Sequence, residues 1–232
     1  MSGATPTAAM ASSEALSAGD LPLEPAEFAR RLTGDVDRFM EAHGLDESRF
    51  SEPLSDAQMR NGLYTRVHGE LVTGDIARRM AEQVDDDDLF VQLAKQAEDE
   101  IKHARLLGQR LKALGGHPAE CFERANDLSK EFWDAIGGRE LIETTAVLQA
   151  GAERMAGFRH PNEQQYYDDE TAMVYEDVIT PDERFHAQVG VNVLRTYCTD
   201  EATQRRALRA SHEGRDIVVD LHDAGYKQAY AE

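Results

Sequence analysis

The motif Asp-Glu-x-x-His-Ala occurs twice in the chain, at residues 99–104 and 182–187. In each copy the Glu and the His are three residues apart, so on a helix they lie about one turn apart on the same face and can clamp a metal ion together. One Glu-x-x-His alone predicts little, because both residues are common on helix surfaces. Here each copy lies within an apolar stripe. Two such copies predict two helices that bury charged side chains, and buried charges need a partner such as a cation.

A lone glutamate precedes each copy at the same distance. Glu70 lies 30 residues before Glu100, and Glu153 lies 30 residues before Glu183. In an antiparallel pair of long helices with a short connection, this separation brings the lone Glu level with the Glu-x-x-His turn. The resulting set of four carboxylates and two imidazoles is Glu70, Glu100, His103, Glu153, Glu183 and His186.

Alternatives to this set come from the same helices. Glu143 could replace Glu153 as a ligand, although it breaks the 30-residue symmetry. Glu176 is either an additional ligand or an exposed glutamate. A hypothesis of another kind is a helical scaffold in which the carboxylates form buried ion pairs and bind no metal.

The hydrophobic pattern predicts an all-α fold, because β-branched runs and hairpin turn signals are absent. Two consecutive helix pairs with a longer link between them describe an antiparallel four-helix bundle with one crossover connection, and the alternative is an open helical array. The predicted long helices span residues 56–83, 88–114, 139–159 and 167–198. Pro181 predicts either a kink or a new helix start within the last of them.

The regions outside this bundle, which covers approximately 56–198, differ in composition. Residues 1–25 are rich in Ala, Ser, Gly, Thr and Pro and predict a flexible tail. Residues 26–232 then form a single helical domain. It includes an extra N-terminal helix, expected outside the main core, and an extra C-terminal helix at about 200–230, expected on the outside because it is polar.

Composition limits the partners of the chain. Its net charge of −19, from 44 acidic and 25 basic residues, disfavours binding to nucleic acid or to an anionic membrane surface. No apolar run is long enough to span a membrane. The two cysteines, Cys121 and Cys198, are too few for a disulfide framework or a four-thiolate metal site, and a cytoplasmic location is expected.

The two Asp-Glu-x-x-His motifs and the two lone glutamates resemble the ferritin-like di-iron and di-manganese carboxylate superfamily, over roughly residues 56–198. Rubrerythrins, bacterioferritins, the small subunit of ribonucleotide reductase and bacterial multicomponent monooxygenases share this constellation. The resemblance implies that the six residues are the metal ligands and the catalytic residues, with Glu100 and Glu183 bridging two metals. It also implies that Asp99 and Asp182 accept hydrogen bonds from the ligand histidines.

The resemblance further implies a function. We expect two Fe ions, with Mn/Fe or Mn as alternatives, and an O2-dependent oxygenase or hydroxylase acting on a small organic substrate. The alternatives are a ferritin-type ferroxidase or iron-storage protein and a rubrerythrin-like peroxidase. Two cysteines cannot build the four-cysteine iron centre of rubrerythrins, and the extra helices depart from a minimal ferritin subunit. A ferredoxin or flavin reductase is the expected electron donor, and a homodimer remains open.

Overall fold

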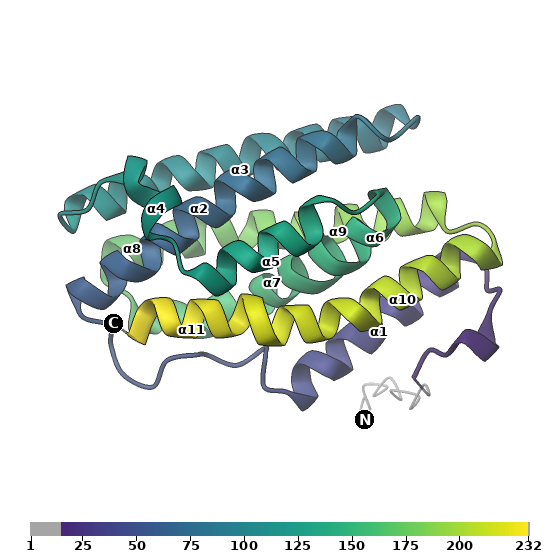
Figure 1. The fold of residues 1–232 in the computed structure, drawn as a ribbon, viewed down its shortest axis with the longest axis horizontal. Helices are drawn as coiled ribbons and strands as arrows, with labels where there is room; N and C mark the ends of the chain where they lie inside the picture. The colour runs from purple at the N-terminus through teal and green to yellow at the C-terminus, as the bar shows by residue number, and fades with distance from the viewer. Residues whose placement is uncertain (1–14, 232) are drawn as a thin grey trace, which may run out of the picture.

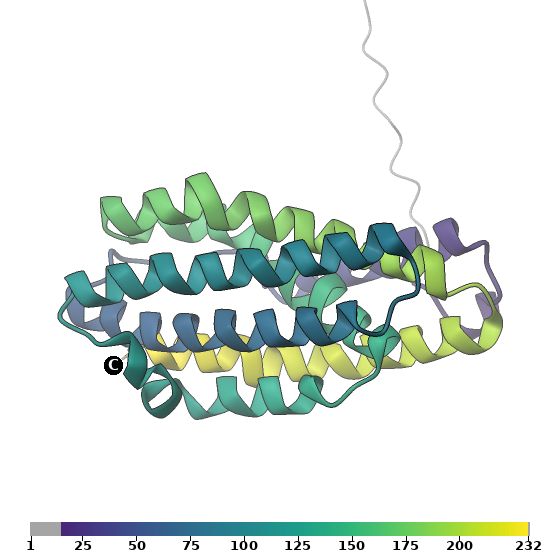
Figure 2. The ribbon, with the colours of Figure 1, turned by 90° about the horizontal axis from the view of Figure 1, so that it is seen from above.

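The computed structural model describes residues 15–231, which form an all-helical fold without a β-strand (Figure 1). The predicted all-α class is thereby confirmed for this part of the chain. The helices α2 (Asp56–Ala81) and α3 (Asp87–Ala113) form a long antiparallel hairpin, and they lie side by side in both views (Figures 1 and 2).

Local signals define the ends of this hairpin. Ser55 caps α2 by accepting a hydrogen bond from the backbone N–H of Gln58, and Asp86 caps α3 through the N–H of Leu89. Gly115 ends α3 with a φ of 80°, in the left-handed region that favours glycine. The observed bounds therefore differ from the predicted ones by no more than two residues.

The third predicted helix is longer and less regular than expected. It consists of α6 (Leu141–Val147), the π-helical segment η3 (Leu148–Glu153) and α7 (Arg154–Glu163). The prediction that it ends before Pro161 is wrong, because α7 continues to Glu163. Buried contacts of Arg159 and Glu163 hold this last turn in place despite the missing proline N–H.

The fourth predicted helix is interrupted where Pro181 indicated a change. It begins as α8 (Asp169–Val174), passes through the π-helical segment η5 (Tyr175–Ile179) and continues as α9 (Thr180–Tyr197). Pro181 lies in the first turn of α9 and has no N–H to donate to the preceding turn. The wide π turn directly before it accommodates this loss without ending the helix.

The connection between the two helix pairs is itself helical. It contains α4 (Cys121–Arg124) and α5 (Asp127–Gly137). Asn126 caps α5 by accepting hydrogen bonds from the N–H groups of Leu128 and Ser129. Phe132, Trp133 and Ile136 of α5 are buried, so this connection is part of the core.

The N-terminal region packs more closely than predicted. The helix α1 (Pro25–Ala42) was expected outside the main core, yet Val36 and Met40 belong to it. Residues 1–14 of the predicted flexible tail lie outside the described residues. The remainder of that tail differs from the prediction, because Leu16 and Leu21 are buried against α1, α9 and α10.

The C-terminal region also differs from the prediction of an external polar helix. It consists of α10 (Glu201–Ile217), the π-helical segment η6 (Val218–Asp223) and α11 (Ala224–Ala231). Tyr226 and Tyr230 of α11 are each 2% exposed. The polar sequence is explained by amphipathicity, since one face contacts solvent and the other closes the side of the molecule next to α2 (Figure 1).

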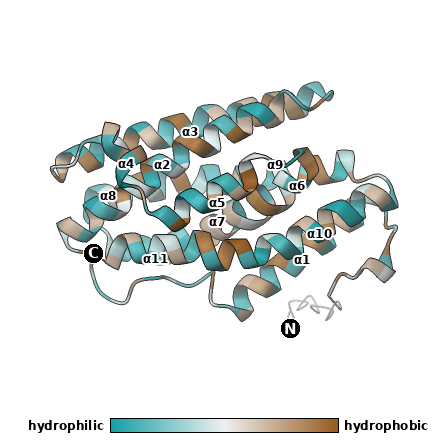
Figure 3. Cartoon of the chain, in the orientation of Figure 1, coloured by the Kyte–Doolittle hydropathy of each residue, from teal (hydrophilic) through white to brown (hydrophobic). Residues whose placement is uncertain are grey.

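On α2, α3 and α9, a layer of polar side chains lies between two apolar clusters, and the layer is at the same level on all three helices. One cluster contains Ile76 and Met80 of α2, Leu89 and Leu93 of α3, and Val189 and Val193 of α9. The other contains Leu63 and Val67 of α2, Leu107 and Leu111 of α3, and Ile179 just before α9. The long helices show mixed apolar and polar segments along their length (Figure 3). The charged residues of the repeated motif lie between the two clusters.

The four long helices do not enclose the polar layer completely, and helices outside the predicted bundle close its remaining side. α2 packs on α3, α3 on α9, and α9 on η3 and α7. Between α2 and η3 the space is closed by α5, η6 and α11. None of the helices formed by residues 15–231 combines the length and the apolarity required to cross a lipid bilayer.

Candidate metal centre

The structure brings five of the six predicted ligands into two groups that could each hold a metal ion. The first group is Glu70, Glu100 and His103, and the second is Glu100, Glu153 and His186. Within each group the three ligand atoms lie within 4.8 Å of one another. Every one of these residues is buried, with side chains from α2, α3, η3 and α9. The matched spacing in the sequence therefore corresponds to proximity in space.

Glu100 is the residue that the two groups share. Its Oε2 atom lies 3.3 Å from Nδ1 of His103, and its Oε1 atom lies 3.1 Å from Nδ1 of His186. The two rings are 6.0 Å apart between centroids. One carboxylate thus presents one oxygen to each histidine, which is the arrangement needed to bridge two cations.

The aspartate of each motif contacts the histidine of the other motif. His103 Nε2 lies 3.0 Å from Asp182 Oδ2, and His186 Nε2 lies 3.6 Å from Asp99 Oδ2. The hydrogen bond of His103 Nε2 to Asp182 leaves its Nδ1 free to bind a metal, and in both histidines Nδ1 is the atom that faces the glutamates. This exchange of partners between the two motifs depends on how α3 and α9 pack.

Lysines hold both aspartates from the surface side. Lys102 Nζ lies 2.6 Å from Asp182 Oδ2 and 2.8 Å from Asp99 Oδ1, and Lys95 also pairs with Asp99. Burial would raise the pKa of Asp99, but the contact with His186 and the hydrogen bonds from Lys102 and Lys95 hold it well below its usual value. Both aspartates are therefore anions that orient the histidine rings.

Glu183 is the sixth predicted ligand and belongs to neither compact group. Its Oε2 atom lies 3.6 Å from His186 Nδ1 and makes no hydrogen bond within the described residues. Complete burial and the neighbouring Glu153 carboxylate raise its pKa well above the usual value. Such a carboxylate requires either a proton or a nearby cation. The implied second bridge by Glu183 remains a prediction.

The raised pKa values of the two histidines also show that the surrounding carboxylates favour positive charge at this site. Burial alone would lower the pKa of His103, but contacts with Asp182, Glu100 and Glu70 raise it to about 12. The pKa of His186 is also raised, because the effect of burial is exceeded by Glu100 and Asp99. The site therefore attracts cations, and carboxylate oxygen with imidazole nitrogen suits transition metals such as iron and manganese.

Two glutamines support the carboxylates and were not identified from the sequence. Gln96 Nε2 lies 3.3 Å from Glu100 Oε1 and 3.3 Å from Glu153 Oε1. Gln149 in turn donates to Gln96 Oε1 at 3.4 Å. Each glutamine precedes a glutamate by four residues on the same helix. A polar residue at that offset within an apolar stripe was the available signal.

The alternative ligands lie away from the centre. Glu143 pairs with Arg206 at 2.7 Å and is absent from both groups, and Glu176 is exposed. By contrast, His160 and His222 are buried. They lie among the arginines on the α11 side of the centre.

A cavity of about 30 Å³ adjoins the centre on that side. Its lining includes the four glutamates Glu70, Glu100, Glu153 and Glu183. The lining also includes four polar or aromatic residues, Arg66, Trp133, His222 and Tyr226. The cavity has room for roughly two waters or for a head group of a few atoms.

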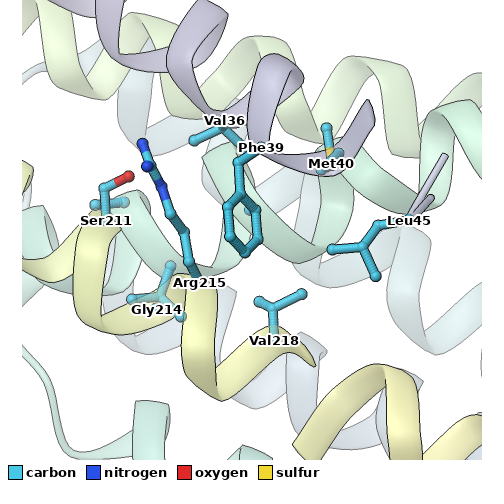
Figure 4. A pocket seen from close by; sticks show the side chains of 11 residues that line it. Val36, Phe39, Met40, Leu45, Ser211, Gly214, Arg215 and Val218 are labelled. Atoms are coloured by element: carbon cyan, nitrogen blue, oxygen red, sulfur yellow. The ribbon is translucent and has the colours of Figure 1, made fainter. Parts of the chain in front are cut away.

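A second cavity lies apart from the centre, between α1 and α10 (Figure 4). Its lining is mostly apolar, with Val36, Phe39, Met40 and Val218 pointing into the same space. Its volume of about 10 Å³ is at the lower limit for one water. We therefore interpret it as a packing gap.

Comparison of the sequence with known protein families and with curated proteins gave no match. The class of protein is therefore inferred from the fold and the site. They define an all-helical protein with buried Glu and His clusters that could hold a metal ion.

Proposed function

We propose that this protein is a non-haem di-iron carboxylate oxidoreductase with a ferritin-like four-helix bundle, formed by α2, α3, the α6–α7 segment and the α8–α9 segment. Its reaction would be the O2-dependent oxidation of a small organic substrate. A ferredoxin or flavin reductase would supply electrons. The observation that carries the proposal is Glu100, which offers one oxygen to each of two symmetric Glu and His groups.

The residues of the chain would hold the metals and control access to them. Glu70 with His103 and Glu153 with His186 would each bind one ion, while Glu100 and Glu183 would lie between them. Two ferrous ions bound there would supply electrons to O2.

Other side chains prepare this environment. Gln96 would keep Glu100 and Glu153 in place by donating hydrogen bonds. Trp133 and Tyr226 close the cavity towards α5 and α11 and thereby limit the entry of bulk water. The oxygenase is favoured over an iron-storage function because this cavity lies directly beside the carboxylates.

Anaerobic titration with ferrous iron is expected to load about two ions per chain. Since the ions would bind only the folded state, a free metal concentration 100 times the Kd would raise the free energy of unfolding by about 2.7 kcal/mol per site. Metal analysis and urea denaturation measure the two quantities. Binding of less than about one ion per chain would contradict the proposed site.

Assembly size and iron uptake separate the oxygenase from the storage alternative. For the oxygenase we expect a small assembly that keeps its iron content near two ions per chain after exposure to air. Size-exclusion chromatography with light scattering and iron analysis test this expectation. A large shell that accumulates many ions per chain would instead establish storage.

Replacing Asp182 with Asn is expected to weaken metal binding about 10- to 100-fold, because His103 would lose its anionic partner. Competition with a chelator gives the affinity. Asp177→Asn is the matched control, since Asp177 is exposed and only five residues away. Equal affinities of the two variants would argue against this role of Asp182.

A further inference from the structure

Three buried arginines beside the centre share two carboxylates. Arg49 binds Glu163 through two hydrogen bonds, at 2.6 and 3.0 Å, and Arg159 pairs with Asp223. Arg66 reaches Glu163 only at 3.7 Å. Asp223 also pairs with Lys227 at 2.8 Å. Within the described residues this cluster therefore holds more positive than negative charge, and Arg66 is the least compensated member.

The neighbouring histidine does not remove this imbalance. Arg66 Nη2 lies 3.1 Å from His160 Nε2, and burial together with Arg66 and Arg49 lowers the pKa of His160 well below its usual value. The neutral ring can accept a hydrogen bond but contributes no negative charge. Arg66 is 5% exposed, and its Nε atom has no hydrogen-bond partner among residues 15–231. A buried guanidinium whose nearest carboxylate lies 3.7 Å away and is shared with Arg49 is only partly compensated, so a further anion is expected near it.

Further donors lie around the same cavity. Trp133 Nε1 and His222 Nδ1 are buried and have no hydrogen-bond partner in the described part of the chain. The Arg66 guanidinium lies 4.4 Å from the centre of the Tyr226 ring. Arg66, Trp133, His222 and Tyr226 all line the same cavity as the glutamates. The cavity lining therefore contains hydrogen-bond donors as well as the carboxylate acceptors.

Gly69 allows two of these donors to approach α2. A Cβ atom at this position would lie 2.8 Å from the Tyr226 hydroxyl and 3.5 Å from Trp133 Nε1. Both groups thus lie over the backbone next to Glu70, and a larger residue would displace them. The close approach concentrates hydrogen-bond donors one turn of α2 away from Arg66.

We propose that this cavity binds the carboxylate group of a small organic acid, with Arg66 as its ionic partner and Tyr226 and Trp133 as additional donors. The inference rests on the proposed function, because two divalent ions would balance the four glutamates and leave the charge of Arg66 unmatched. A carboxylate fits a guanidinium in a planar geometry, and a cavity of about 30 Å³, with room for roughly two waters, can take the two oxygens of a carboxylate. The substrate is then an organic acid oriented with its carboxylate towards Arg66.

The test uses Trp133, the only tryptophan of the chain, as a fluorescent reporter. The full chain is loaded with Zn²⁺, its metal content is measured, and acetate is titrated at constant ionic strength. We expect a saturable fluorescence change with acetate and none with acetamide or chloride. Equal responses to acetate and to either control compound would overturn the proposal.

Variants distinguish Arg66 from direct binding of acetate to the metal. Arg66→Gln should weaken acetate binding about tenfold or more, which is the effect expected when a charge-assisted hydrogen bond is lost. Tyr226→Phe should weaken it roughly two- to tenfold. Tyr166→Phe is the control, because Tyr166 does not line the cavity, and it should leave the affinity unchanged. If Arg66→Gln binds acetate as the parent does, or if the two tyrosine variants are equal, the proposal is wrong.

The metal measurement separates this inference from the proposed function. Normal zinc loading without acetate binding would overturn the carboxylate site and leave the metal centre intact. Acetate binding that depends on Tyr226 in a chain that takes up no metal would support the carboxylate site and overturn the di-metal proposal.

Discussion

Glu100→Ala is expected to abolish the binding of both metal ions. Glu100 belongs to both ligand groups and directs one carboxylate oxygen towards each histidine, so its loss removes a ligand from both ions at once. It also leaves Gln96 without one of its acceptors. Metal analysis after anaerobic loading gives the stoichiometry.

The other glutamates provide graded comparisons for this experiment. Glu70→Ala should mainly affect the ion beside His103, and Glu153→Ala the ion beside His186, so each variant should retain about one ion. Glu176→Ala, at an exposed position, should load normally. If Glu100→Ala retains as much metal as Glu176→Ala, the shared-ligand assignment is wrong.

Glu163→Gln is expected to lower the free energy of unfolding by about 3–5 kcal/mol at pH 7, because it leaves buried arginines without their anion. Burial would raise the pKa of Glu163, but Arg49 and its hydrogen bonds hold it below the usual value of 4.5. The stabilisation is therefore complete above pH 4.5, the unfolded value, and is lost as the pH falls through the lower folded value. Urea denaturation at several pH values measures it.

The matched control for this variant is Glu143→Gln. Glu143 also pairs with an arginine, but that pair is partly exposed, with 35% of the Arg206 side chain and 23% of the Glu143 side chain accessible. Its removal should cost less than about 1 kcal/mol. If the free energies of unfolding of the two variants differ by less than about 1 kcal/mol, the buried cluster does not depend on Glu163.

Local chemistry explains which features were predictable from the sequence. The Glu-x-x-His spacing places both side chains on one helix face, and the equal 30-residue separations are sufficient to identify Glu70 and Glu153 as their partners. The ends of α2 and α3 follow from caps and from Gly115, which act within a few residues. These features need only helix geometry and short connections.

Other features required the tertiary structure because they join distant segments at particular packing angles. The exchange of partners between Asp182 with His103 and Asp99 with His186 depends on how α3 and α9 lie together. The burial of the terminal helices was mispredicted because a polar helix can still bury one face when a neighbour is available. The sequence did not reveal Arg66 as part of the cavity lining, because the cavity is formed by segments that are far apart in the sequence.

The sequence by itself determined the helical class and the repeated Glu and His pattern, since both arise from spacing along a helix. Only the tertiary structure decided that Glu100 is shared by both groups, and that α5 and α11 close a cavity lined by Arg66 and the glutamates. The physical reason is that a shared ligand and an uncompensated buried charge are properties of distances between segments. Those distances are set by side-chain packing across the whole fold.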